Sequence, residues 1–521
     1  MSERHHISPW VIALTVMIAT FMEVLDTSVA NVALPHIAGD LSATVEETTW
    51  VLTSYLVANA VVLPLGGYFS SLMGRKRFYL TCVGIFTVSS VACGLAPSLG
   101  WLIFFRILQG LGGGGLQPIS QAILVETFPH EKRGSAMAVY GMGVVLAPII
   151  GPVLGGWITD NFSWHWIFLI NLPVGLLSMA LTTSLVHDPP TFHRLTLKEG
   201  RGFDYTGIGI LTLGLASLEF VLDEGQRKDW FASGWILAFS VIAVVALVTA
   251  VVYELKKEHP IVDLRLLMNR NFAVATFMLF VLGFVLYGSL ALLPIFLQTL
   301  LGYTAMQSGW VLSPGGVAVL VMMPVVAILL KRFDPRPLIG FGFLTCGIGL
   351  ILMSNFNLQV PMETAVWTRV VQSLGFAFLF VPINVTAFQF VPHNKTNYAA
   401  GLMNLVRNIG GSAGIAIATT LLARRAQLHQ ANLIGNLTPS NPAYQAFLDR
   451  AGQLGVLRAG LSPPDAAHLA QGAAYGQVLR QSSMMAFADT FLFMGVLCIL
   501  LLPLLLMMRK THITGPITIG E

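Results

Sequence analysis

The chain alternates between long apolar runs and short polar connections. An apolar run of about 20 residues crosses the hydrocarbon core of a bilayer as a helix. The pattern therefore predicts an all-α polytopic membrane protein with fourteen transmembrane helices. Their expected bounds are 10–34, 48–70, 78–96, 101–124, 136–158, 166–186, 205–222, 233–253, 272–298, 307–330, 337–354, 364–388, 399–422 and 487–508.

Basic residues orient these helices. Cytoplasmic connections of membrane proteins collect lysine and arginine. One set of alternate connections holds 19 of the 29 basic residues, and the other set holds 7. The remaining three, Arg106, Arg369 and Arg407, fall inside predicted helices. We therefore expect both termini in the cytoplasm and the long connection 423–486 outside.

The amino-acid composition excludes the other broad classes of protein. The chain is 55% hydrophobic and 10% charged, whereas soluble domains carry about 25% charged residues. The net charge of +4 comes with no basic tract interleaved with aromatics, so no nucleic-acid partner is expected. The four cysteines lie in apolar runs without CxxC spacing, and neither HExxH nor GxxxxGK[ST] occurs. We expect no metal, no cofactor and no ATP site, and a protein that is not an enzyme.

The sequence repeats weakly at an offset of about 260 residues. "FMEVLDTSVANVALP" from Phe21 parallels "FVLGFVLYGSLALLP" from Phe280. "RILQG" at Arg106 parallels "RVVQS" at Arg369. Several matches in the same order at one offset indicate two related six-helix halves.

The repeat divides the chain into three parts. Parallel six-helix repeats with a binding site at their interface are an architecture of secondary transporters. The expected parts are an N-terminal half at 1–190, two inserted linker helices at 191–270, and a C-terminal half at 271–521 that contains the outside connection 423–486.

Two carboxylates interrupt the first apolar run. Glu23, Asp26, Thr27 and Asn31 share one face of a helix. A charge near the bilayer centre costs roughly 2.5–3.5 kcal/mol on insertion scales, and such residues are functional by default. A carboxylate of this pair that exchanges a proton could couple transport to protons. The alternative is an acid neutralised permanently by an intramembrane arginine or by hydrogen bonds.

Further polar residues lie within predicted helices. Arg106 is either the counter-charge of the acids or a structural donor to carbonyl groups, and we assign it to proton coupling with Glu23 and Asp26. The expected cavity or gating residues are Asn31, Gln109, Gln117, Asn384 and Arg407.

The segment "GVVLAPIIGPVLGG" predicts a smooth helix face. Small residues four apart let helices approach closely, and proline bends a helix. The face serves either packing alone or a hinge and seal between the halves. The face consists of Gly143, Ala147, Gly151 and Gly155, and the motif also includes Pro148, Pro152 and Gly156.

These motifs resemble those of the 14-helix drug:proton antiporters of the major facilitator superfamily, most closely the EmrB type. "LDTSVANVALP" resembles the first-helix motif of that family, "RILQG" its fourth-helix arginine motif, and "APIIGPVLGG" its fifth-helix antiporter motif. "WHWIFLINLPVG" and "HPIVDLRLL" are also similar to stretches of the group. The resemblance covers nearly the whole chain.

One motif departs from the family pattern. "GGYFSSLMGRKR" resembles the cytoplasmic loop motif between the second and third helices, but Ser71 and Leu72 stand where an acid and a base are usual. The resemblance therefore does not extend to the latch that those two residues make in relatives. The motif residues that remain are Gly67, Gly74, Arg75 and Lys76.

The resemblance implies a proton-coupled antiporter that exports hydrophobic or amphipathic compounds across a bacterial inner membrane. It also implies a periplasmic adaptor protein and an outer-membrane channel as partners. In this scheme unprotonated Asp26 favours the drug-accepting inward state, and Glu23 has a milder role. The alternatives are an exporter dedicated to one metabolite such as a siderophore, a proton-coupled uptake symporter, and a non-transporting receptor or scaffold.

The outside connection carries a helix-start signal. Ser462 can cap a helix, Pro463 and Pro464 suit a first turn, and Asp465 favours its positive end. We therefore expect a small helical element there. It serves either as a docking surface for the adaptor protein or as a solvated cover over the cavity.

Overall fold

The computed structural model describes residues 8–129, 132–187, 204–258, 260–392, 395–459 and 462–509, and every regular element in these ranges is a helix. Thirteen of them are long and apolar enough to cross a membrane. The bent helix α7 makes a fourteenth when its two parts, Arg133–Pro148 and Ile150–Asn161, which meet at 43°, are counted as one span. The prediction of fourteen spans is therefore confirmed, and so is the bend at the proline pair. The domain boundary at 190/191 lies outside the described residues.

The first half of the molecule contains the expected six spans, several of them interrupted. The span expected at 101–124 is two helices, α5 and α6, which meet at Gly114 and Gly115. A Cβ on Gly114 would lie 2.5 Å from the Asn59 carbonyl oxygen, so the absence of a side chain lets this junction pack closely on α3. The helices are α1 Pro9–Asp40, α2 Val45–Thr48, α3 Trp50–Met73, α4 Arg75–Gly94, α5 Leu99–Gly113, α6 Leu116–Thr127, α7 Arg133–Asn161, α8 His165–Leu169 and α9 Asn171–Leu185.

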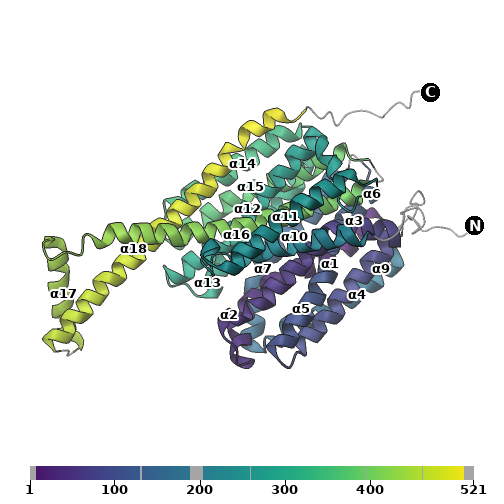
Figure 1. The fold of residues 1–521 in the computed structure, drawn as a ribbon. Helices are drawn as coiled ribbons and strands as arrows, with labels where there is room; N and C mark the ends of the chain where they lie inside the picture. Colours follow the sequence, from purple (N-terminus) through teal and green to yellow (C-terminus); the bar gives the residue numbers. More distant parts are fainter. Residues whose placement is uncertain are drawn as a thin grey trace, which may run out of the picture.

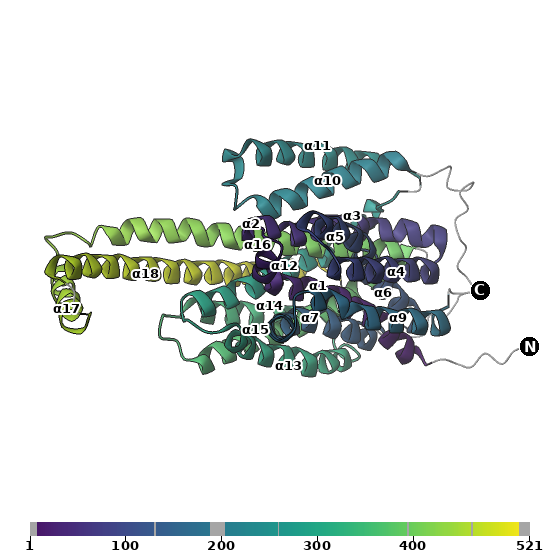
Figure 2. The same cartoon turned by 90° about the horizontal axis from the view of Figure 1, so that it is seen from below.

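Two inserted helices, α10 (Tyr205–Glu224) and α11 (Gly234–Lys256), lie along one side of the bundle, as Figure 2 shows. Asp204 caps α10 by accepting a hydrogen bond from the Gly207 amide at 3.0 Å. Helix α10 faces inward and packs on α3 and on α16 (Thr396–Ile434), while α11 packs mainly on α10. The inserted pair thus contacts helices of both halves.

The second half contains the remaining six spans. Its helices α12 and α16 pack against each other, as do α14 and α15. Short 3-10 segments at Trp230–Ala232, Leu264–Met268 and Leu502–Met507 complete the described elements. The helices are α12 Arg270–Thr299, α13 Ala305–Leu329, α14 Pro335–Ser354, α15 Met362–Gln389, α16 Thr396–Ile434, α17 Pro442–Ala459 and α18 Pro463–Leu500.

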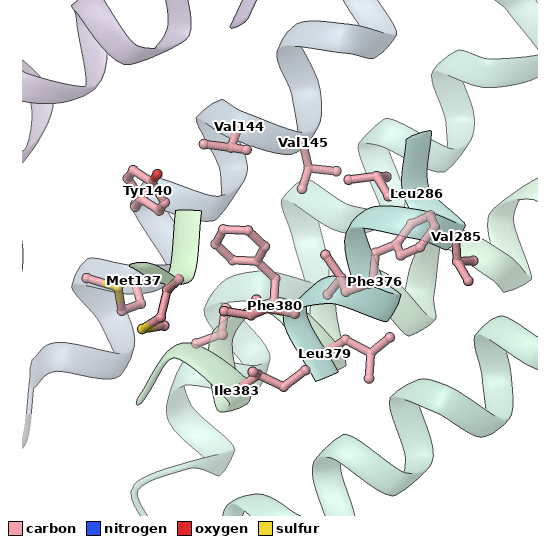
Figure 3. Packing of buried hydrophobic residues seen from close by; sticks show 14 of the residues in the cluster. Met137, Tyr140, Val144, Val145, Val285, Leu286, Phe376, Leu379, Phe380 and Ile383 are labelled. Atoms are coloured by element: carbon pink, nitrogen blue, oxygen red, sulfur yellow. The ribbon is translucent and has the colours of Figure 1, made fainter. Parts of the chain in front are cut away.

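The two halves meet along α7 and along α3. Helix α7 packs on α13 and α15, and α3 packs on α16. Figure 3 shows Met137, Tyr140 and Val145 of α7 beside Phe376 and Phe380 of α15 in one apolar cluster. The Tyr140 and Phe380 ring centres are 5.9 Å apart. The four cysteines are buried and free, as expected.

The connection expected at 423–486 is a helical hairpin. Helices α16 and α18 run on past the bundle, and α17 lies at the far end of the molecule from the first turn of α1 (Figure 1). Ser462 caps α18, since its hydroxyl oxygen accepts a hydrogen bond from the Asp465 amide. This contact confirms the predicted helix start. The expected small size was wrong, because α18 continues for 38 residues into the last span. His429 of α16 bonds to Asp489 of α18 at 2.9 Å and links the hairpin's two arms.

Candidate functional site

Asp26 lies in a buried ion pair. Its Oδ2 accepts a hydrogen bond from Arg106 Nη1 at 2.5 Å. Its Oδ1 accepts from Gln109 Nε2 at 3.0 Å and from Asn171 Nδ2 at 2.7 Å. Asp26 is 3% exposed and Arg106 0%. Four helices, α1, α5, α9 and, through Ser90, α4, are tied together at this point.

Arg106 is also fixed from its other side. Its Nε donates to the Val51 carbonyl oxygen at 2.9 Å, and its guanidinium lies 4.2 Å from the centre of the Tyr55 ring. A buried charge pair is stable only when hydrogen bonds satisfy its remaining atoms, and here most are satisfied. Asp26 thus has the surroundings of the permanently neutralised acid named among the alternatives.

Glu23 lies one turn away in quite different surroundings. Its Oε1 accepts from Tyr55 OH at 3.1 Å and from Asn59 Nδ2 at 3.0 Å, and its Oε2 accepts from Gln117 Nε2 at 2.7 Å. All three donors are neutral, and no ion pair to Glu23 occurs among the described residues. The two acids that share a face in sequence therefore point to different neighbours.

Glu23 forms part of the wall of a cavity of about 110 Å³ between the halves. The wall comes from α1, α3, α6, α10, α12 and α16, so both halves and the inserted pair contribute. Its polar members are Glu23, Thr27, Tyr55, Asn59, Gln117, Glu219, Tyr287, Asn408 and Ser412. Such a mixed wall sets apolar and polar groups beside a carboxylate, the combination with which ligand pockets bind and orient small molecules.

Arg407 stands behind Gln117. Its Nη2 donates to Gln117 Oε1, and the amide of Gln117 in turn donates to Glu23. The arginine is 2% exposed and does not itself line the cavity. A single glutamine thus connects an acid of the first half to a base of the second.

A second polar layer joins the halves one turn further along α6. Gln121 donates to Asn384 Oδ1 at 2.5 Å and accepts from Asn404 Nδ2 at 2.7 Å. Tyr140 of α7 donates to Asn404 Oδ1 at 3.3 Å. Because α6 and α7 belong to the first half, and α15 and α16 to the second, this layer closes the bundle on that side of the cavity.

The small-residue face of α7 packs on α1. A Cβ on Gly151 would lie 2.5 Å from Ser28 Cβ, and one on Gly155 would lie 3.1 Å from Val29 Cα. Gly143 faces Met17 in the same way, whereas Gly156 meets only Val32 Cγ1 at 3.9 Å. Ala147 is fully buried. The close contacts of the small-residue face are therefore with α1, a helix of the same half.

The loop motif lies where the halves approach each other at one end. A Cβ on Gly67 would lie 3.1 Å from the Tyr398 Cα, and Gly74 has a φ of 86° between α3 and α4. Arg75 pairs with Glu126, and Lys76 Nζ donates to the Thr183 carbonyl oxygen at 2.5 Å. The two basic residues of the loop motif thus tie α4 to α6 and α9.

The expected cavity residues separate into different places. Gln117 lines the cavity, Gln109 belongs to the Asp26 ion pair, and Asn384 belongs to the layer that closes the bundle. Asn31 is exposed and outside the cavity lining. These assignments were made from polarity alone, which shows that a residue is special but not which neighbour it meets.

Several polar residues of the site have no assignment from the sequence, among them Tyr55, Asn59, Asn171 and Glu219. Tyr55 and Asn59 are polar at i and i+4 within a span, and Asn171 lies in the quoted "INLPVG" stretch. Glu219 is a carboxylate inside an apolar run, the same signal that identified Glu23. Applied to the inserted helices, that signal would have found it.

A helical bundle of two six-helix halves around a central polar cavity defines a membrane transporter of the secondary type. The sequence profile of the Major Facilitator Superfamily matches residues 16–415, and the chain belongs to this family. The chain is 36% identical to multidrug export protein EmrB of Escherichia coli (strain K12) over 447 residues, 86% of each chain. It is 36% identical to fatty acid resistance protein FarB of Neisseria gonorrhoeae over 516 residues, 97% of each chain.

The fold has solved counterparts. The proton:xylose symporter XylE, in a structure with 6-bromo-6-deoxy-D-glucose, superposes with a TM-score of 0.57 over 94% of each chain, at 16% identity. That likeness supports the fold alone. The expectations of a major facilitator fold and of an EmrB-type relative are both confirmed.

Proposed function

We propose that this transporter is a proton-coupled exporter of chemically diverse hydrophobic or amphipathic compounds. The observation that carries the proposal is the cavity between the halves with Glu23 in its wall. The 36% identity to a multidrug export protein over 86% of both chains supports the substrate class. A cavity whose wall mixes apolar side chains with polar groups from both halves and from the inserted pair suits varied amphipathic substrates.

The geometry supports Glu23, rather than Asp26, as the site that exchanges the proton. Glu23 meets the cavity and has only neutral donors, so protonation breaks no ion pair. Protonation of Asp26 would leave Arg106 buried without a counter-charge, which is costly. In this scheme an ionised Glu23 accepts the substrate, and proton entry releases it.

Alternating access then requires the closing layer to break and reform. We propose that the contacts of Gln121 with Asn384 and Asn404 hold one entrance shut while the cavity is open on the other side. Close approach of Gly67 to Tyr398 supports the same closed end. Rocking of one half against the other around the fixed site would exchange the two entrances.

Transport by purified protein in liposomes tests the proposal. The substrate panel contains an amphipathic cation, a neutral dye, a long-chain fatty acid and a siderophore, each with and without a proton gradient. Gradient-driven movement of several unrelated compounds, opposite in direction to the protons, is expected. Movement of a single compound would indicate a dedicated exporter, and movement with the protons would indicate an uptake symporter.

Glu23→Gln tests the coupling site. Because glutamine cannot ionise, gradient-driven accumulation should fall to the level without a gradient, while counterflow of substrate in the absence of a gradient remains. Glu363→Gln, at an exposed first-turn position of α15, is the control and should transport normally. Normal proton-driven transport by the Glu23→Gln protein would exclude Glu23 as the coupling group.

We further propose that the transporter lies in the inner membrane of a bacterium with two membranes, with both termini cytoplasmic. The resemblance to the EmrB type supports a periplasmic adaptor protein and an outer-membrane channel as partners. The hairpin of α16, α17 and α18 lies at the end opposite to the start of α1, on the side where such an adaptor would be met (Figure 1). Its tip contains an open hollow of about 300 Å³ beside Tyr444 and Phe447.

A further inference from the structure

Glu219 is a buried carboxylate on the inserted helix α10. It is 5% exposed and lies in a helix that is otherwise almost entirely apolar up to its last turn. One of its oxygens, Oε1, accepts a hydrogen bond from Ser412 of α16. A carboxylate at membrane depth is costly, so its position calls for a reason beyond the packing of α10.

The Glu219 side chain lies in the wall of the same cavity as Glu23. The two acids reach it from different parts of the molecule, since Glu23 belongs to the first half and Glu219 to the inserted pair. No basic side chain forms an ion pair with Glu219 among the residues that the structure describes. Glu23, by contrast, has Arg407 behind its partner Gln117.

A third acceptor belongs to a residue of the same wall. The side-chain oxygen of Asn408, another wall residue, is shielded from solvent and has no hydrogen-bond partner among the described residues. Asn408 and Ser412 are one turn apart on α16, so this oxygen and the carboxylate of Glu219 belong to the same side of the cavity. Two acceptors without a matching cation define a place for a positively charged donor.

The neighbouring acids of the inserted pair have other roles. Asp223 accepts a hydrogen bond from Thr53, and Glu224 pairs with Arg227 at 3.2 Å. Glu254 accepts the Ile261 amide at 2.7 Å and so fixes the turn after α11. None of these three lines the cavity. Glu219 alone among them combines burial, a cavity position and the lack of a strong partner.

We propose that Glu219 is the cation-recognition group of the transport cavity, so that the inserted helix pair sets the preference for substrates with a positively charged nitrogen. This inference rests on the proposed export function. The carboxylate of Glu219 attracts the charge of the substrate, the Asn408 oxygen accepts an N–H of the substrate, and Ser412 holds the carboxylate toward the cavity. Glu23 remains free to exchange its proton.

Equilibrium binding of two fluorescent probes to the purified protein, without any gradient, tests the inference. Ethidium carries a fixed positive charge and N–H donors, and Nile red is neutral. Because the loss of a hydrogen bond to a charged group weakens binding at least about tenfold, Glu219→Gln should raise the Kd of ethidium at least about tenfold. The Kd of Nile red should stay within about twofold of wild type.

Two further variants separate charge from structure. Glu219→Asp keeps the charge, and Ser412→Ala keeps the carboxylate while removing its hydrogen bond, so both should retain more ethidium affinity than Glu219→Gln. Three results would overturn the inference. Glu219→Gln could weaken the binding of both probes equally, or it could leave ethidium binding unchanged. Ser412→Ala could also lose as much ethidium affinity as Glu219→Gln does. Proton-driven transport by the Glu23→Gln protein tests the proposed function separately, so failure of one is distinguishable from failure of the other.

Discussion

Breaking the Asp26–Arg106 pair should destabilise the transporter strongly. Both groups are essentially excluded from solvent and their closest atoms are 2.5 Å apart. Removing one partner of a buried pair costs about 3–5 kcal/mol, because the other charge stays buried without compensation. We therefore expect Asp26→Asn and Arg106→Leu each to lower the free energy of unfolding by about 3–5 kcal/mol.

The double variant carries the decisive information. When both charges are absent, no uncompensated charge remains. The Asp26→Asn/Arg106→Leu protein should therefore lose clearly less free energy of unfolding than the two single variants lose in sum. Unfolding of the purified protein in mixed micelles, titrated with sodium dodecyl sulfate, gives these free energies. Additive losses would refute the view that the pair acts as one neutral unit.

The second half supplies a matched control. Arg369 is equally buried and donates to Gln372 at 2.5 Å, as Arg106 does to Gln109 at 2.8 Å. It has Ser289 at 3.3 Å but no carboxylate partner among the described residues. Arg369→Leu should therefore lower the free energy of unfolding much less than Arg106→Leu does, or even raise it. A loss as large as that of Arg106→Leu would show that hydrogen bonds rather than charge pairing dominate at both sites.

Two other parts of the molecule lead to predictions. Gly151→Ala should slow transport in liposomes several-fold, because the new Cβ overlaps Ser28 on α1. The control Gly156→Ala should transport normally in the same assay, because its nearest neighbour is 3.9 Å away. Equal transport rates for the two variants would contradict the argument that α7 and α1 approach closely at Gly151. Replacing residues 436–461 by a short flexible linker removes α17 and should leave transport in liposomes unchanged but abolish drug resistance in cells with two membranes. Equal loss in both assays would assign α17 to folding or gating, and unchanged resistance would exclude it as the docking element.

Much of the fold could be predicted because its signals are local. A run of apolar residues crosses the bilayer wherever it packs, and the cap at Ser462 depends only on the next few residues. The different partners of Glu23 and Asp26 could not be predicted from neighbouring residues in the sequence. Residues three apart on a helix differ by about 60° in direction, and which neighbour each meets depends on where α3, α5 and α9 pack. The same holds for Glu219, whose helix lies outside the internal repeat.

The long arms of the hairpin make it a mechanical lever. Helix α18 has 38 residues and α16 has 39, so each is about 57 Å long, against about 30 Å of hydrocarbon. Each arm is one uninterrupted helix that exceeds the thickness of the hydrocarbon by about 25 Å and is continuous with the second half. Each degree by which that half tilts about the middle of the bilayer displaces the tip by about 0.7 Å. A partner held at α17 would therefore be displaced whenever that half tilts, and by resisting the displacement it would slow the transport cycle.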